Sequence, residues 1–203
     1  MITKVSSGLP ISHGNRRINV AKLAAVAKAN IEHTGKLDLG CGDNKREGFF
    51  GIDKFKTEST DAEIDLFQFP WPIDSDSVDE VHCSHFFEHV PVAMRKPFME
   101  ELHRIMKVGA SAQIITPLGN RYMQDPTHQW PPIIPESYLY YNQDWLKQNK
   151  LMHGDYLINA DFDYSYGHAL HPNVASRNAE FQAFAMQFYN NAATDLYVTL
   201  VKK

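Results

Sequence analysis

A turn with two glycines is the part of this sequence whose residue types are best suited to bind a ligand. The apolar segment 37–39 leads into Gly40, Cys41 and Gly42, and a main chain without Cβ atoms can approach a bound molecule closely. A dinucleotide fingerprint needs a third small residue at the position where this chain has Lys45. The turn therefore indicates a nucleoside-type ligand without a pyrophosphate.

The next apolar segment supports a nucleoside. Residues 49–53 are expected to form a short strand that ends in Asp53, and a carboxylate at that place can accept hydrogen bonds from both hydroxyls of a ribose. Asp38, at the end of the preceding strand, can accept hydrogen bonds from backbone amides or from an amino group of the ligand.

Taken together, these segments resemble the class I S-adenosylmethionine (SAM) methyltransferases, in particular the methyltransferase type 11-like group of bacteria and phages. The resemblance covers residues 36–128 and is carried by segments 37–42, 51–53, 65–72, 77–81, 85–89 and 101–107. Val108 and Ala110 replace the proline and glycine that are usual in the family, away from the ligand. The resemblance implies SAM as the cofactor and S-adenosylhomocysteine as its product. It also implies in-line methyl transfer to an acceptor that the sequence does not identify, a small molecule or sugar being favoured.

The resemblance also assigns the residues of the cofactor site. In it, Asp65 accepts a hydrogen bond from the adenine amino group while the Leu66 amide donates to the ring, and the end of the fourth strand faces the place where methyl donor and acceptor meet. The expected cofactor-binding residues are Asp38, Gly40, Cys41, Gly42, Asp53, Lys54, Asp65, Leu66, Ser84 and His85.

Proton transfer at the acceptor points to a second group of residues. Asp125 and His128 follow the fifth expected strand within a loop at 118–135 that should overhang the pocket, and His85 follows the fourth. An imidazole titrates near neutral pH, so these three residues are the catalytic candidates. A purely structural alternative stays open, in which Asp125 caps the loop and His128 bonds to the backbone.

Two other functions compete with methyl transfer. His85, Glu88 and His89 match the H-x-x-E-H pattern of inverted zinc peptidases. Pro91 places the start of a helix after this motif, so the two histidines would not share one helical face, and no metal is expected. The second rival is a SAM-binding regulatory or scaffolding module without transfer activity, which would use the same glycine turn.

Alternating strands and helices predict an α/β fold with a doubly wound, Rossmann-like sheet of seven strands, mostly parallel with one antiparallel strand near the C-terminus. The whole chain, 1–203, is expected to be one domain, with a loosely held leader at 1–17 and loops over the pocket at 118–135 and 163–180. Strands are expected at 36–39, 49–53, 62–66, 78–83, 112–116, 156–162 and 196–201, the last as an edge or hairpin strand, and helices at 19–31, 91–107, 135–150 and 181–189.

Composition limits the choice of partners. The 203 residues carry a formal charge of -4, which gives no strong indication of nucleic-acid binding. Only two cysteines are present, Cys41 and Cys83, and they form no zinc or disulfide pattern. No apolar run reaches the length of a membrane span. A cytoplasmic protein with a small-molecule or sugar acceptor is therefore expected, and its oligomeric state is left open.

Overall fold

A computed structural model describes residues 34–203, so the expected leader at 1–17 and helix at 19–31 lie outside the described residues. The described chain forms one seven-stranded sheet in the order β3-β2-β1-β4-β5-β7-β6. The strands are β1 (Lys36–Leu39), β2 (Phe50–Asp53), β3 (Ala62–Glu63), β4 (Val78–Ser84), β5 (Met106–Pro117), β6 (Phe162–Leu170) and β7 (Ala193–Lys202). β7 is antiparallel to both of its neighbours, and the other pairings are parallel. The expected mixed sheet with one antiparallel strand is confirmed.

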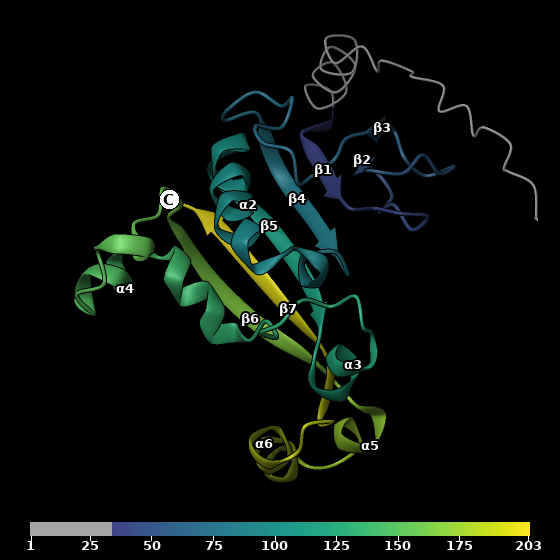
Figure 1. Ribbon diagram of the computed structural model, residues 1–203. Coiled ribbons are helices and arrows are strands. Elements are labelled where there is room, and N and C mark those ends of the chain that lie inside the picture. Colours follow the sequence, from purple (N-terminus) through teal and green to yellow (C-terminus); the bar gives the residue numbers. More distant parts are fainter. Residues whose placement is uncertain (1–33) are drawn as a thin grey trace, which may run out of the picture.

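The helices lie on the sheet and beyond its ends. Figure 1 shows α2 packed along the face of β4 and β5, with α4 at one side and α5 and α6 below the far ends of β6 and β7. The helices are η1 (Phe87–His89), α2 (Val92–Ile105), α3 (Gly119–Gln124), η2 (Pro135–Tyr141), α4 (Gln143–Gln148), η3 (Gly154–Tyr156), α5 (Pro172–Ala175) and α6 (Ala179–Phe188).

The core forms between the sheet and α2. Leu37, Leu39 and Ile52 of the central strands are fully buried, and so are Phe98 and Leu102 of α2. Strands buried on both faces read as continuous apolar runs, which explains why β1 and β2 were predictable from the sequence. Their burial fixes the register of the sheet and thereby the position of the turn that follows β1.

Several elements differ from the expectation. The strand expected at 156–162 is wrong, because that segment begins at the last residue of η3 and only its own last residue, Phe162, joins β6. The expected loop at 163–180 is wrong in the same region, since it contains most of β6, all of α5 and the start of α6. The aromatic and histidine-rich composition of β6 reads as a loop in isolation. It becomes a strand because it pairs along its full length with β7.

Three further expectations, two on boundaries and one on a strand's place in the sheet, are corrected. The third strand keeps only Ala62–Glu63 of the expected 62–66. The helix expected at 135–150 breaks at Asn142, whose side-chain oxygen caps α4 by accepting from the Trp145 amide at 2.9 Å. The last strand is not an edge, because β7 lies between β5 and β6 and leaves β6 at the edge of the sheet.

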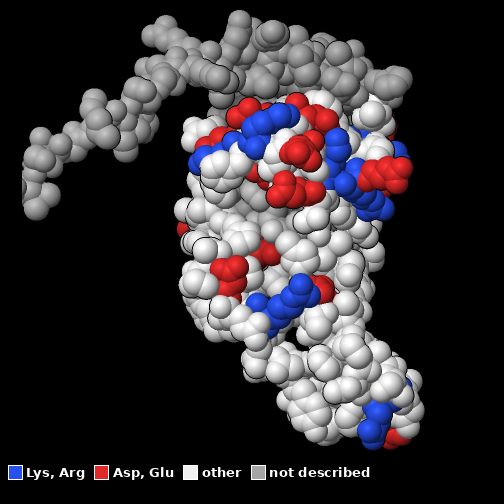
Figure 2. All heavy atoms as spheres, turned by 90° about the vertical axis from the view of Figure 1, so that its right-hand side faces the viewer, with Lys and Arg blue, Asp and Glu red and all other residues white. Residues whose placement is uncertain are grey.

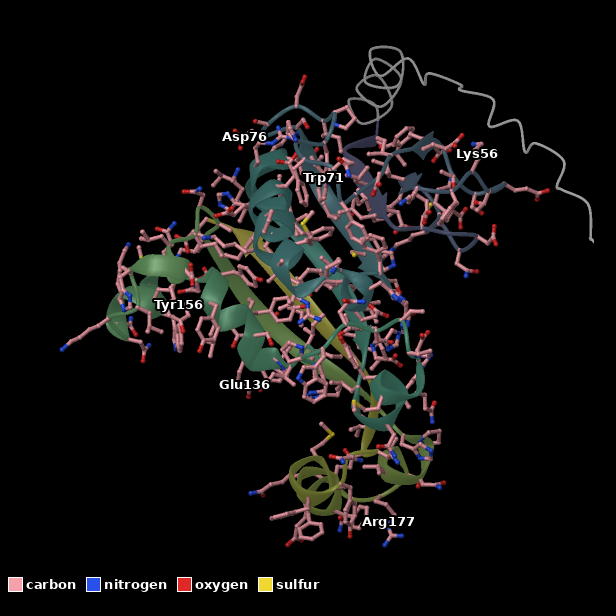
Figure 3. All side chains as sticks on the ribbon, in the orientation of Figure 1. Lys56, Trp71, Asp76, Glu136, Tyr156 and Arg177 are labelled. Carbon is pink, nitrogen blue, oxygen red and sulfur yellow. The ribbon has the colours of Figure 1, made fainter. Side chains whose placement is uncertain are left out.

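An ion pair between the buried Glu101 and the partly exposed Arg104 fastens the segment between β3 and β4 onto α2. Glu101 Oε1 accepts from the Trp71 amide at 2.6 Å and from Arg104 Nη2 at 2.6 Å. The same guanidinium donates to the Trp71 and Ile73 carbonyls at 3.2 and 2.8 Å. Figure 3 shows Trp71 and Asp76 at this end of the molecule, where β4 begins.

We expect Arg104→Ala to lower the free energy of unfolding by about 2–3 kcal/mol, because it leaves the buried Glu101 carboxylate without its cationic partner. Urea unfolding followed by circular dichroism measures this change. Lys147→Ala is the matched control, since its ion pair with Asp144 is exposed, and it should change stability by less than about 0.5 kcal/mol. Equal effects of the two substitutions would show that the pair does not hold this segment.

Candidate functional site

The topology brings the expected cofactor residues to one edge of the sheet. β3, β2, β1 and β4 run parallel, so their carboxyl ends meet at the same side. The chain order reverses at β1, which pairs with β2 on one side and β4 on the other. Ligands of open α/β sheets bind outside the carboxyl ends of the strands at such a switch point. The turn after β1 therefore lies where this fold class places its ligands.

The glycine turn is held by main-chain hydrogen bonds. Gly40 and Gly42 have positive φ angles of 68° and 50°, a region that favours glycine. The Gly40 amide donates to the Ile52 carbonyl at 2.8 Å, and the Gly42 amide donates to Asp53 Oδ2 at 3.0 Å. A side chain at position 40 would collide with the Phe86 ring, whereas a Cβ at position 42 would enter open space. The Phe86 ring thus fills the space beside Gly40, whereas the space beside Gly42 is unoccupied by protein atoms.

The carboxylates after β2 and β3 are engaged but accessible. Asp53 is half-buried and uses Oδ1 to accept from the Phe55 amide at 2.9 Å. Lys54 Nζ lies 3.4 Å from Asp65 Oδ2, which links the two expected cofactor positions through an exposed ion pair. Leu66 is buried, and its carbonyl accepts from the Trp71 indole at 3.2 Å. These residues line the strand ends beside the turn.

Asp38 occupies a different position from the other carboxylates. It is 2% exposed, and its Oδ2 accepts from the Arg46 amide at 2.7 Å. Burial raises the pKa of this carboxyl to about 6. Asp38 therefore holds the loop that contains Arg46 in place. Of the two roles expected for Asp38, this is the one in which it accepts from a backbone amide. Burial also raises the pKa of the Cys41 thiol to about 11, so this cysteine is not a reactive nucleophile.

The three catalytic candidates line one pocket of about 550 Å³ at the carboxyl ends of β4 and β5. Its walls come from the β4 end and η1 on one side and from α3 and the loop after it on the other. The lining residues are His85, Glu88, His89, Pro117, Arg121, Gln124, Asp125, Pro126 and His128. Three of these, His85, Asp125 and His128, are the expected catalytic residues, and two more, Glu88 and His89, belong to the H-x-x-E-H motif.

His85 lies between two carboxylates. Its Nδ1 is 3.5 Å from Glu88 Oε1, and its Nε2 is 3.7 Å from Asp195 Oδ1. The hydrogen bond to Glu88, with the charges of Glu88 and Asp195, raises the pKa of this imidazole above its ordinary value. The ring is 44% exposed. His85 is thus an accessible base whose protonated form is stabilised by its neighbours.

His128 is oriented by the backbone. Its Nδ1 lies 2.7 Å from the Tyr122 carbonyl oxygen, which can only accept, so the ring proton is on Nδ1 and Nε2 carries a lone pair. His128 Nε2 is 3.6 Å from Asp125 Oδ2. Asp125 Oδ1 accepts from the amide and hydroxyl of Thr127 at 2.8 and 2.7 Å, and these bonds lower the pKa of the carboxyl. The hydrogen bonds expected for a purely structural role are therefore present: Asp125 caps the loop and His128 bonds to the backbone.

The H-x-x-E-H motif does not form the helical zinc site of a peptidase. His85 precedes η1 and has a φ of 54°, and η1 contains only Phe87–His89. The two histidines of the motif therefore do not lie on one face of a helix. This confirms the reason for which the zinc peptidase was set aside.

Sequence reasoning missed Asp195 and Arg121. Asp195 is 6% exposed at the start of β7, opposite Pro117 of β5, and it binds Arg121 Nη1 at 2.8 Å. An acidic residue directly before the alternating apolar pattern of the last strand was the available signal. Its location beside His85 follows from the pairing of β7 with β5, which the local sequence does not encode.

Comparisons with known proteins place the fold. No protein-family model and no curated protein matches this chain. A SAM-dependent methyltransferase from Archaeoglobus fulgidus has a similar structure, with 17% identity, a TM-score of 0.55, and coverage of 89% of this chain and 94% of that one. A methyltransferase from Mesorhizobium loti is similar at 18% identity and a TM-score of 0.45, covering 82% of this chain and 90% of that one. The first likeness shows that the chain has the Rossmann-like methyltransferase fold.

We expect the stability of the protein to depend on pH through Asp38. Because its pKa is higher in the folded state than in the unfolded state, its stabilising contribution is complete at low pH and is lost as pH rises through about 6. Asp38→Asn removes this loss. The free energy of unfolding of the variant minus that of the wild type should therefore increase by on the order of 2 kcal/mol from about pH 4.5 to about pH 7.5.

Urea unfolding of both proteins at the two pH values measures this difference. Any stability that the variant loses through its altered hydrogen bond to Arg46 is the same at both pH values, so it cancels when the two differences are compared. A wild-type-to-variant difference that stays constant with pH would contradict the raised pKa.

Proposed function

We propose that this chain is a SAM-dependent methyltransferase that acts on a small-molecule or sugar acceptor. The observation that carries the proposal is the hydrogen-bonded unit of the glycine turn and Asp53 at the switch point of the sheet. Beside it, at the ends of β4 and β5, lies the pocket that contains His85. A cofactor cradle and an acceptor pocket thus adjoin one another along one edge of the sheet.

The residues at the strand ends fit the parts of the cofactor. Gly42 leaves open space where a larger residue would place its side chain. Asp53 would accept from the ribose hydroxyls, and Asp65 with the Leu66 amide would bind the adenine edge. Lys54, Gly40, Cys41 and Asp38 would shape the turn, with Ser84 and His85 at the methyl end.

SAM supplies an electrophilic methyl group on a sulfonium whose leaving group is a neutral thioether, so the protein's part is to position the acceptor and to receive its proton. His85 would receive this proton, because Glu88 and Asp195 flank its ring and stabilise the imidazolium. Asp125 and His128 would orient the acceptor from the opposite wall of the pocket.

Charge and thiols support the choice of acceptor and compartment. On the face seen in Figure 2, basic and acidic side chains are interspersed around β1 to β3 rather than gathered by sign, a pattern that does not favour a polyanionic acceptor. Both cysteines are free and buried, which fits a reducing cytoplasm. The described chain has no helix long and apolar enough to cross a membrane.

The cofactor assignment predicts that Asp53→Ala weakens SAM binding roughly tenfold or more, as the loss of a charge-assisted hydrogen bond of about 1.5–3 kcal/mol would. Isothermal titration calorimetry with SAM measures the affinity. Glu58→Ala is the control, because Glu58 is an exposed carboxylate in the segment just after Asp53. Unchanged affinity in Asp53→Ala would exclude this ribose-binding role.

Methyl transfer itself is tested with methyl-labelled SAM and a metabolite extract, followed by mass spectrometry. We expect one labelled small molecule, and a transfer rate that rises with pH as His85 loses its proton. His85→Ala should lower the rate about 10²–10⁴-fold. Tight SAM binding without label in any acceptor would favour the alternative, a SAM-binding regulatory or scaffolding module.

A further inference from the structure

We propose that Glu88, His89 and His128 form a binding site for a divalent transition-metal ion in the pocket beside His85. One candidate ligand atom of each of these residues lies within 4.8 Å of the others. Two imidazoles and one carboxylate are a recurring ligand set for zinc and for non-haem iron, with further positions open for water or substrate. The sequence predicts no metal at the H-x-x-E-H motif, because Pro91 places the start of a helix after it.

Glu88 supplies the observation that points to a ligand. The residue is 1% exposed, and its Oε2 is buried without a hydrogen-bond partner among the described residues. Its other oxygen lies 3.5 Å from His85 Nδ1, which is near the limit of a hydrogen bond. An unsatisfied buried carboxylate oxygen is costly, and a bound cation would satisfy it.

The hydrogen bonds of the two histidines engage the same nitrogen, Nδ1, of each ring. His128 Nδ1 donates to the Tyr122 carbonyl at 2.7 Å. The Thr127 hydroxyl donates to Asp125 Oδ1 at 2.7 Å, so at 3.1 Å it accepts from His89 Nδ1. The tautomer that these bonds favour carries its lone pair on Nε2 in each ring. Fixing the ring by an Nδ1 hydrogen bond is the usual support of a metal-binding histidine.

Hydrogen bonds join the two segments that would supply the ligands. The Gln129 amide donates to the Glu88 carbonyl at 2.9 Å, and Gln129's own carbonyl accepts from the Tyr122 hydroxyl at 2.6 Å and from Arg95 Nη2 at 2.8 Å. The rings of His89 and His128 pack edge to face, with 4.8 Å between their centroids. The candidate ligands are therefore brought together before any ion binds, which lowers the cost of ordering them.

The charges around the cluster suit a cation. Arg121 lines the pocket, but its guanidinium is paired with Asp195 at 2.8 Å. Asp125 adds a carboxylate near His128. If the proposed methyl transfer is correct, a metal at this place would lower the pKa of a bound acceptor hydroxyl and favour oxygen acceptors. Metal binding itself does not depend on that activity.

The test is a titration of the full chain, first treated with chelator, with Zn²⁺ in competition with a chromophoric chelator. Co²⁺ serves as a spectroscopic probe of the ligands. We expect one ion per chain, and an affinity at least about 100-fold lower in His89→Ala and in His128→Ala. Thr127→Val, which removes the hydroxyl that accepts from His89 and donates to Asp125, should weaken binding about 10–100-fold. His153→Ala is the control, because His153 is exposed and outside the cluster, and it should bind like the wild type.

Two measurements keep the result interpretable. Thermal unfolding by circular dichroism shows whether each variant folds, and Glu88→Gln provides a ligand change of nearly equal shape. SAM calorimetry on the same variants separates this proposal from the cofactor assignment, since SAM affinity should persist when metal binding is lost. Failure of the wild type to bind Zn²⁺ stoichiometrically, or unchanged affinity in folded His89→Ala, would overturn the site.

Discussion

The site depends on the way in which the end of β2 anchors the turn after β1. The Ile52 carbonyl accepts from the Gly40 amide and the Asp53 carboxylate from the Gly42 amide, at 2.8 and 3.0 Å. These bonds exist only because β1 and β2 are parallel and in register, with Leu39 opposite Ile52. A shift of one residue would turn Asp53 away from the turn and expose Ile52, so burial of the apolar strands and placement of the ligand carboxylate are set by one constraint.

Buried carboxylates mark the site, and they are compensated in different ways. Asp38 receives the Arg46 backbone amide, which offsets only part of the burial that raises its pKa, and Asp195 receives the Arg121 guanidinium. Glu88 has one oxygen without a partner. Since an uncompensated buried polar group is expensive, the amide and the guanidinium account for the burial of Asp38 and Asp195, whereas the unpartnered oxygen of Glu88 is the feature on which the proposed metal site rests. This contrast separates the residues that build the site from the one that faces its contents.

The sequence predicted those parts of the fold whose signals are local. The apolar runs of β1, β2 and β4, the α2 stripe and the glycine turn all lie within short windows, and their order restricts the topology. It did not predict β6, whose polar pattern becomes a strand only by pairing with β7. Nor did it bring His128 to Glu88 or Asp195 to His85, because those contacts arise from loops that follow separate strands and from the antiparallel return of the last strand.

One short segment joins the two halves of the site. At His85 the chain leaves β4 with a φ of 54°, and it then directs Phe86 against Gly40 and Glu88 into the pocket. The Phe86 ring also stacks on Phe67, at 5.8 Å between centroids, in the segment that follows β3. Residues 85–88 therefore contact both the glycine turn, through Phe86, and the pocket, through His85 and Glu88. The position of this short segment depends on the packing of Phe86 as much as on the end of β4, because close-packed aromatic rings leave little space for an alternative arrangement.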